Sequence, residues 1–435
     1  MSKVKVLLIF AACIALVAIS WAATIFAKTD TQKQKELVDR AEAYIADEIY
    51  IKAEPLLAEA ASYDTKYTSE IEEQLKTIYL KMIDKRSYDK KYIGLLNEQM
   101  SEKNPNPKVF SEAADYYFQR NKLTDGIASL REGFEKTKDP SLKEEYEKAR
   151  YEFRVEGETY DDVKTCYGGA VQVMNDGLWG AAAANGNLVI PCIYNAISTY
   201  SNGQAVARSG NTLEGIDAEM NRTALYHGSA REFTNYACGR LGIKETKGYA
   251  LADGALREKE DIFYQELGMF NDDRAPAKYE GKWGLIDTSG DWVIEPIYEE
   301  IICDEDLGYA FSKDRFFAKA GGKVYLFDGK GKQIGEDNYE DARPFYGSYA
   351  AVKKDGKWGF IDSNGFLGIE CSFDDAKSFG QHLAAVKTGR YWGYISTAGK
   401  TAIEPVFLDA KSFSGGSAAV QTVDGWQFIT LYEYM

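Results

Sequence analysis

The sequence predicts three parts in order: an apolar N-terminal segment (residues 1–27), an α-helical domain (residues 28–158) and an all-β repeat array (residues 161–435). Three observations predict this fold class. An uncharged stretch begins after Lys5, apolar residues recur at helical spacing in the next part, and one tryptophan–glycine motif recurs at a fixed period in the last part. A fixed period of this length indicates a repeat architecture.

Residues 6–27 carry no charged side chain and follow Lys3 and Lys5. About 20 apolar residues span a bilayer, whereas the apolar core of a signal peptide has roughly 7–15. The stretch therefore predicts an uncleaved signal-anchor helix, in a single-pass protein of the cell membrane with most of its chain outside the cytoplasm. A cleavable signal peptide ending at Ala23 or Ala27 is the alternative. Lysines also follow the apolar stretch, so the difference in charge between its two ends does not decide the orientation in the membrane. The orientation is therefore inferred from the short basic N-terminus that leads directly into the stretch.

The helical domain contains few glycines, and its small, aliphatic and aromatic residues recur in sets. One set is Leu37, Ala41, Tyr44, Ala53, Leu57 and Ala60, and a second is Phe110, Ala114, Tyr117, Gly126, Leu130 and Gly133. Their offsets resemble the helix-packing positions of the tetratricopeptide family, which implies three helical hairpins. Residues 141–156 are expected to form a capping helix. A helical stalk without a binding groove is the alternative.

The repeat array is defined by a motif in which tryptophan precedes glycine. Residues 357–365 repeat the pattern of residues 282–290, and residues 391–399 repeat it again, with a spacing of 34 residues from Trp358 onward. The intact positions are Trp179, Gly180, Trp283, Gly284, Trp358, Gly359, Trp392, Gly393 and Trp426, and worn copies occur at Leu213, Tyr249 and Val324. About eight units fit this register, the last one truncated. Because most tryptophans share one repeat position, we expect them to have a structural role in the core.

Each unit predicts three short strands. Asp355-Gly356 between two apolar runs indicates a hairpin turn. Gly359 is expected where a neighbouring ring or backbone comes too close for a Cβ atom. Pro296 and Pro405 place the third strand at an outer edge, because proline cannot donate a hydrogen bond to a neighbouring strand.

These motifs, with a trailing Ile-x-Pro-x-aromatic motif, resemble the bacterial WG-repeat proteins over roughly residues 160–435. The resemblance implies an all-β array with a binding role, and it implies no reaction. A closed, propeller-like ring is the preferred architecture, because closure hides the edge strands that otherwise promote aggregation. An open β-solenoid, capped by helices at one end, is the alternative.

One unit is longer than the others, because 41 residues separate Trp283 from Val324. The extra residues fall near Asp304–Lys313 and include the acidic cluster Asp304-Glu305-Asp306. We expect this cluster to be a solvated loop rather than a metal site.

Composition and missing motifs argue against several functional classes. The net charge of −15 disfavours a nucleic-acid partner. The two histidines, His227 and His382, lie in different units without partners at metal-ligand spacing, and no phosphate loop, dinucleotide fingerprint or Gly-x-Ser-x-Gly motif occurs. We therefore expect no enzyme activity, no metal and no cofactor. The cysteines beyond residue 27 are odd in number and form no CxxC pair, so they are expected to be free thiols.

Two functions remain. The first is a membrane-anchored, non-catalytic scaffold that binds protein partners outside the cytoplasm. The second is an extracytoplasmic receptor that binds a glycan or cell-wall ligand through the repeat aromatics. Buried tryptophans would favour the scaffold, whereas an exposed and aligned set of Tyr200, Tyr346 and Tyr391 would favour the receptor.

Overall fold

The computed structural model describes residues 30–63 and 65–435, which form two compact units that meet between Tyr146 and Glu147. The expected membrane segment, residues 6–27, lies outside the described residues. Within the described part of the chain, no helix is both long and apolar enough to cross a membrane.

The described residues of the N-terminal unit contain helices and no strand. Its helices are residues 30–46, α2 (Tyr50–Ala61), α3 (Thr68–Lys81), α4 (Arg86–Met100), α5 (Pro107–Phe118), α6 (Leu123–Thr137) and α7 (Pro140–Ala149). Successive helices pack against one another from α2 to α6. The order of helices agrees with the expected hairpins, and the tetratricopeptide resemblance itself stays a prediction.

Local sequence explains the last hairpin of this unit. Asn106 caps α5 by accepting a hydrogen bond from the Lys108 amide, and Pro107 occupies the first helical position, where no donor is needed. The following helix, α6, approaches closely because it presents glycines. A Cβ atom at Gly133 would lie 2.6 Å from the Cβ of Phe110, so a larger residue there would push the two helices apart.

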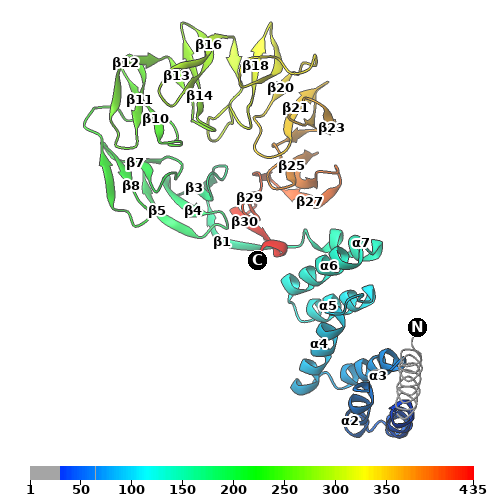
Figure 1. Cartoon of the computed structure of the whole chain (residues 1–435). Coiled ribbons are helices and arrows are strands. Elements are labelled where there is room, and N and C mark those ends of the chain that lie inside the picture. The colour runs from blue at the N-terminus through cyan, green and yellow to red at the C-terminus, as the bar shows by residue number, and fades with distance from the viewer. Residues whose placement is uncertain (1–29, 64) are drawn as a thin grey trace, which may run out of the picture. The chain divides into compact units, whose positions relative to one another are not determined.

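The C-terminal unit consists of eight small antiparallel sheets arranged as the blades of a closed ring (Figure 1). Blade 1 contains β2 (Asp162–Val163), β3 (Ala170–Asn175), β4 (Leu178–Ala183) and β5 (Leu188–Tyr194); blade 2 contains β6 (Ala196–Ile197), β7 (Ala205–Ser209), β8 (Thr212–Ile216) and β9 (Arg222–Leu225); blade 3 contains β10 (Arg240–Glu245), β11 (Gly248–Asp253) and β12 (Glu258–Tyr264); and blade 4 contains β13 (Glu266–Leu267), β14 (Arg274–Tyr279), β15 (Lys282–Asp287) and β16 (Trp292–Tyr298). Blade 5 contains β17 (Glu300–Ile301), β18 (Arg315–Ala320) and β19 (Lys323–Asp328); blade 6 contains β20 (Asp341–Ala342), β21 (Ala350–Lys354), β22 (Lys357–Ile361) and β23 (Leu367–Phe373); blade 7 contains β24 (Asp375–Ala376), β25 (Leu383–Thr388), β26 (Tyr391–Ser396) and β27 (Thr401–Phe407); and blade 8 contains β28 (Asp409–Ala410), β29 (Ser417–Thr422), β30 (Gly425–Leu431) and β1 (Phe153–Tyr160).

Blade 8 closes the ring by combining both ends of the unit. Strand β1 pairs antiparallel with β30, with Phe153 opposite Leu431 and Glu156 opposite Phe428. The truncated last unit therefore receives its outer strand from the N-terminal side. The closed ring is confirmed over the open solenoid.

The same pairing corrects the expected domain boundary. Residues 153–158 were expected in the helical domain, with residues 141–156 as its capping helix. Helix α7 ends at Ala149 and β1 begins at Phe153, so the β domain starts before residue 161. No local pattern marks this strand as part of the array, because its partner lies at the other end of the unit.

The repeated tryptophan position lies on the third strand of a blade and faces the core between blades. Trp358, Trp392 and Trp426 are at most 5 % exposed, whereas Trp179 and Trp283 are half-buried. Trp358 packs with Ala376, Phe379 and other residues of the core between blades 6 and 7. The worn positions hold the same place: Leu213 lies in β8, Tyr249 in β11 and Val324 in β19.

The glycine after the tryptophan is required by the backbone of the outer strand. A Cβ atom at Gly359 would lie 2.7 Å from both the Cys371 amide nitrogen and the Ile369 carbonyl oxygen, and one at Gly393 would lie 2.5 Å from the Ile403 carbonyl oxygen. The register shifts at this point, so the outer strand bulges over the glycine. Pro296 and Pro405 lie in the outermost strands β16 and β27, as predicted.

Candidate binding site at the propeller axis

The insertion in the fifth unit crosses the middle of the ring. Residues 304–313, here called the axial loop, connect β17 to β18. The Asn235 side-chain amide of blade 3 donates to the Leu307 carbonyl oxygen at 3.0 Å, and the Met269 amide of blade 4 donates to the Gly308 carbonyl oxygen at 3.0 Å. The Tyr309 hydroxyl donates to the Phe345 carbonyl oxygen of blade 6 at 3.3 Å. The axial loop therefore joins blades 3, 4 and 6.

The acidic cluster of this loop was expected to be solvated, which holds for Glu305, whose side chain is 50 % exposed, and fails for Asp304 and Asp306. Asp304 accepts hydrogen bonds from the amides of Asp306 (3.1 Å) and Leu307 (2.9 Å), and burial raises the pKa of its carboxyl group. The Asp306 side chain is 7 % exposed and accepts from the Thr165 hydroxyl at 2.7 Å and from the Lys411 amine at 2.8 Å. Asp304 therefore fixes the turn of the loop, whereas Asp306 binds a cation of another blade.

Four cations face the two carboxylates of Glu305 and Asp306. Lys164, Arg343, Lys377 and Lys411 each follow the short inner strand of blades 1, 6, 7 and 8 respectively. Asp306 pairs with Lys411 at 2.8 Å and with Lys164 at 3.9 Å, whereas Glu305 pairs with Arg343 at 3.0 Å and contacts Lys377. The two carboxylates partly neutralise these four cations, which we call the basic half-ring; Asp162 and Asp375 also pair with Lys164 and Arg343.

Each of these cations also lies over the repeat tryptophan of its own blade. The distances from the charged group to the ring centroid are 5.5 Å at Trp179, 5.0 Å at Trp358, 5.6 Å at Trp392 and 5.2 Å at Trp426. Such cation–π contacts stabilise a partly desolvated cation. The positive charges still repel one another: burial and then repulsion from Lys411 lower the pKa of the Lys377 amine to about 8.

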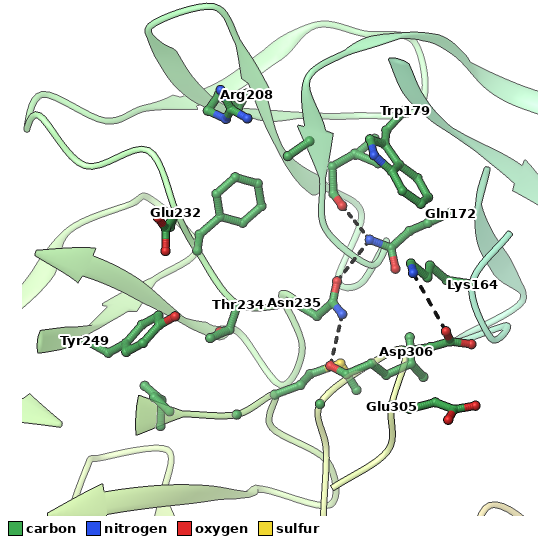
Figure 2. A pocket seen from close by; sticks show the side chains of 18 of the residues that line it. Lys164, Gln172, Trp179, Arg208, Glu232, Thr234, Asn235, Tyr249, Glu305 and Asp306 are labelled. Atoms are coloured by element: carbon green, nitrogen blue, oxygen red, sulfur yellow. Dashed lines mark hydrogen bonds and ion pairs between the residues drawn. The ribbon is translucent and has the colours of Figure 1, made fainter. Parts of the chain in front are cut away.

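A cavity of about 500 Å³ lies beside the axial loop, between blades 1 to 4, and Glu305, Asp306 and Lys164 are among the residues that line it. We call it the axial pocket (Figure 2). Figure 2 shows Gln172 and Trp179 on one side of it and Glu232 and Tyr249 on the other, with the axial loop below. Its volume falls in the range of small-ligand sites, roughly 300–1,000 Å³.

A chain of amides fixes one wall of the axial pocket. The Gln172 side-chain nitrogen donates to the Ile197 carbonyl oxygen and to Asn235 Oδ1, the latter at 3.1 Å. Asn235 Oδ1 also accepts from the Thr199 amide at 3.0 Å, and its nitrogen donates to the axial loop. Strand β3 of blade 1 is thereby joined to blades 2 and 3. Within the described residues, Gln172 Oε1 and Arg208 Nε are buried without a hydrogen-bond partner.

The sequence contains a signal for Gln172 that the motif analysis missed. It lies seven residues before the tryptophan position, opposite Ala181 in β4. The equivalent residues of the other blades are all apolar: Val206, Gly242, Pro276, Phe317, Ala351, Ala385 and Ala419. Gln172 is thus the single polar departure from an apolar repeat position. Arg208 carries no such signal, because Lys244, Lys278 and others are basic at its position.

The tyrosines that would indicate a glycan platform are not aligned. Tyr391 is 45 % exposed, whereas Tyr200 and Tyr346 are half-buried. The Tyr200 hydroxyl donates to Gly203 O at 2.9 Å and the Tyr346 hydroxyl donates to Cys166 O at 2.6 Å. The repeat aromatics therefore do not form an exposed ladder, and only those at blades 1 and 3 line the axial pocket.

The remaining predicted residues lie apart from the axial pocket. His227 and His382 are exposed at separate blades, and the part of the chain that the structure describes contains no group of three potential metal ligands. The described cysteines are free, and burial raises the pKa of the Cys303 thiol to about 12.

Comparison with known proteins identifies the repeat. The family model described as WG containing repeat matches residues 179–212, 264–283, 283–323, 326–358, 358–391 and 392–426. No curated protein matches the chain.

Several solved structures resemble the ring at low identity. YCF48 from Cyanidioschyzon merolae is 12 % identical, with 65 % of this chain and 99 % of that chain covered and a TM-score of 0.34. The Neurospora crassa Pan2 WD40 domain is 9 % identical, with 62 % and 88 % covered and a TM-score of 0.33. The extracellular domain of BT4673 from B. thetaiotaomicron is 10 % identical, with 66 % and 44 % covered and a TM-score of 0.32. At these TM-scores the structures carry no argument about this chain.

Proposed function

We propose that the chain, which the WG-repeat model matches at six stretches between residues 179 and 426, is a membrane-anchored, non-catalytic scaffold that binds protein partners outside the cytoplasm. The structural role of the repeat tryptophans supports this proposal. The repeat tryptophans of blades 6, 7 and 8 are buried, and each is covered by a cation. The repeats therefore build a rigid ring, and binding falls to features that are not repeated, such as the axial pocket and the helical unit.

The charges at the axial loop support a binding role rather than catalysis. Glu305 and Asp306 are engaged with cations, and Asp306 accepts further hydrogen bonds from Thr165. A general acid or base has to exchange a proton with a substrate at working pH. Carboxylates held in ion pairs at the centre of the ring are better suited to fixing the loop.

The proposed location outside the cytoplasm depends on the uncharged residues 6–27, which follow Lys3 and Lys5 in the sequence. A reporter fused after Met435 is expected to be active only outside the cytoplasm, and the protein should stay with membranes in high salt. Protection of the C-terminus from protease in intact protoplasts, or release by high salt, would contradict this location.

Partner binding is tested by cross-linking in intact cells with the full chain, followed by reconstitution of each captured protein with the purified chain. The proposal predicts saturable binding with fixed stoichiometry to at least one protein. If no captured protein binds the purified chain, the scaffold proposal fails.

A receptor for a glycan is the second candidate, and one observation favours it. Trp179, Phe233 and Tyr249 all line the axial pocket, and aromatic rings are common in sugar-binding sites. Titration of the purified chain with soluble cell-wall oligosaccharides, followed by tryptophan fluorescence, tests this candidate. Saturable quenching that is lost in Trp179→Ala and kept in Trp358→Phe would favour the receptor.

A further inference from the structure

The chain contains a single asparagine that is followed, two positions later, by serine or threonine: Asn221-Arg222-Thr223 in blade 2. In an exported protein this pattern is the acceptor motif for N-linked glycosylation. Glu219 lies two residues before Asn221, so the segment also fits the longer, acidic form of the motif, Asp/Glu-x-Asn-x-Ser/Thr. Because so short a motif also arises by chance, its surroundings in the folded chain decide whether it is a usable acceptor.

The whole motif lies on the surface. Residues 219–223 are five consecutive exposed residues, and they form the turn between β8 and β9 and the start of β9. Strand β9 is the outermost strand of blade 2, so no further strand of the blade covers it. A transferase can therefore reach the motif without opening the core of the ring.

The strand that follows Asn221 is weakly held. Strand β9 has four residues, whereas the corresponding strands β5 and β16 have seven each. Its register against β8 shifts between Ala224 and Arg222, which leaves Thr223 without an opposite residue. A short edge strand with a bulge opens locally at less cost than the centre of a blade. The motif can therefore adopt the conformation that an enzyme requires.

The turn itself departs from the repeat at Met220. This residue has a φ of 63°, in the left-handed region, and its exposed fraction is 45 %. Leu256 of blade 3 has a similar φ of 59° but is 4 % exposed, so packing offsets its strain. No such burial offsets the strain at Met220. Five other blades have glycine at this position of the turn: Gly186, Gly290, Gly331, Gly365 and Gly399.

The two side chains that glycosylation requires make only surface hydrogen bonds. Asn221 Nδ2 donates to Asp217 Oδ2 at 3.0 Å, and the Thr223 hydroxyl donates to Gln204 Oε1 at 2.5 Å. Water can replace both bonds at little net cost, because all four groups are near solvent. The Asn221 amide and the Thr223 hydroxyl are therefore both available to an enzyme.

We propose that Asn221 carries an N-linked oligosaccharide that is transferred from a lipid pyrophosphate carrier. In the transfer, Asn221 Nδ2 bonds to the anomeric carbon of the sugar and gives up one proton to a base of the transferase. The bond between that carbon and the pyrophosphate oxygen breaks, and the lipid pyrophosphate leaves. The inference rests on the proposed location outside the cytoplasm, where such transferases act. The glycan covers the free edge of β9, which is otherwise open to pairing with other chains.

The direct test is mass spectrometry of the full-length chain purified from its native membranes. Trypsin cleaves after Arg208 and Arg222 and releases residues 209–222, which contain Asn211 as well as Asn221. The peptide is expected to be heavier by one oligosaccharide, and fragmentation should place the sugar on Asn221. Unmodified Asn221 in a chain whose C-terminus lies outside the cytoplasm would overturn the proposal.

A pair of substitutions at Thr223 tests the motif without changing the acceptor. Thr223→Val is expected to lower the glycosylated fraction by about tenfold or more, because it removes the hydroxyl that the transferase recognises, whereas Thr223→Ser should keep it. Thr212→Val is the control, since it removes an exposed hydroxyl of the same blade outside the motif. Circular dichroism melting curves show whether the variants fold. Equal glycosylation of Thr223→Val and the unmodified chain would overturn the proposal.

A reaction with purified components separates the acceptor site from the location. The full-length chain in detergent is incubated with an oligosaccharyltransferase that accepts the acidic motif and with its lipid-linked oligosaccharide. If Asn221 is modified here while the C-terminal reporter is active only in the cytoplasm, the acceptor site stands and the proposed location fails. If the reporter is active outside the cytoplasm and Asn221 stays unmodified here, the location stands and the glycosylation proposal fails.

Discussion

At the scale of single residues, the tryptophan–glycine pair joins two different requirements of one blade. The tryptophan fills the core between neighbouring blades, and Trp358 is 5 % exposed there. Gly359 lets the outer strand cross directly above it, with Cys371 and Ile369 too close for a Cβ atom. A core requirement and a backbone requirement at adjacent positions explain why the pair recurs as a unit.

Trp358→Ala is expected to lower the free energy of unfolding by ~3–5 kcal/mol, because a large buried aromatic side chain is lost. Chemical denaturation of the purified β unit measures this change. Trp179→Ala is the matched control at the same repeat position, and its cost should be smaller because Trp179 is half-buried. If Trp358→Ala kept its stability but lost ligand binding, the repeat tryptophans would bind ligand rather than stabilise the fold.

Gly359→Ala is expected to cost ~1–3 kcal/mol, because the added methyl group strains the packing of the outer strand. Thermal melting of the variant tests this cost. Gly94→Ala in α4 is the comparison, since no atom lies within 4 Å of a Cβ there and the change should stabilise its helix by up to about 1 kcal/mol. A Gly359→Ala protein as stable as the unmodified one would rule out the close approach.

At the scale of elements, the axial loop shows how an insertion can become part of the core of a ring. Its carboxylate Asp306 is 7 % exposed and its partner Lys411 is 10 % exposed, so neither charge is well solvated. Leu307 and Tyr309, each 2 % exposed, anchor the loop among residues of other blades. The loop thus connects the basic half-ring with the axial pocket, because Asp306 and its partner Lys164 also line that pocket.

Asp306→Ala is expected to destabilise the protein by ~3–5 kcal/mol, because it leaves Lys411 buried without its counter-charge. Adding Lys411→Met should recover part of this loss, with a coupling energy of ~1–3 kcal/mol in a double-mutant cycle. The exposed pair Asp253–Arg257 serves as the control and should show ~1 kcal/mol or less. A coupling energy no larger than that of the control would contradict a buried ion pair.

Most of the β architecture could be predicted from the sequence, because its determinants are local. The period placed the strands and turns, and Pro296 and Pro405 marked the outer edge correctly. Strand β1 could not be predicted, since its partner β30 lies about 270 residues away and the register between them leaves no periodic trace. The place of the axial loop was missed for a similar reason, because its cations come from four blades and only folding brings them together.

The candidate site was less predictable than the fold. Gln172 could have been found as the polar residue at an otherwise apolar repeat position. Arg208 could not, because basic residues are frequent at its position in other blades, and only its lack of a partner distinguishes it. A missing partner is a property of the folded structure and leaves no pattern in the sequence.

At the scale of the whole molecule, the ring is closed by pairing residues from both ends of its unit. Closure removes the exposed strand edges that would otherwise pair with other chains. It also makes the eight blades depend on one another, because β1 completes the sheet that holds the last repeat tryptophan, Trp426. One strand of eight residues, Phe153–Tyr160, therefore determines whether the ring is a single cooperative body.

The measurement that tests this closure most directly is guanidinium denaturation of two fragments, residues 147–435 and residues 161–435, followed by tryptophan fluorescence. The first fragment contains β1, and the second lacks it. Residues 147–435 should be monomeric and unfold in one cooperative transition, with a slope that reflects a large buried surface. Residues 161–435 should unfold at lower denaturant, with a shallower slope, and should tend to aggregate through the uncovered edge of β30. Equal midpoints and slopes for two monomeric fragments would contradict the closed ring.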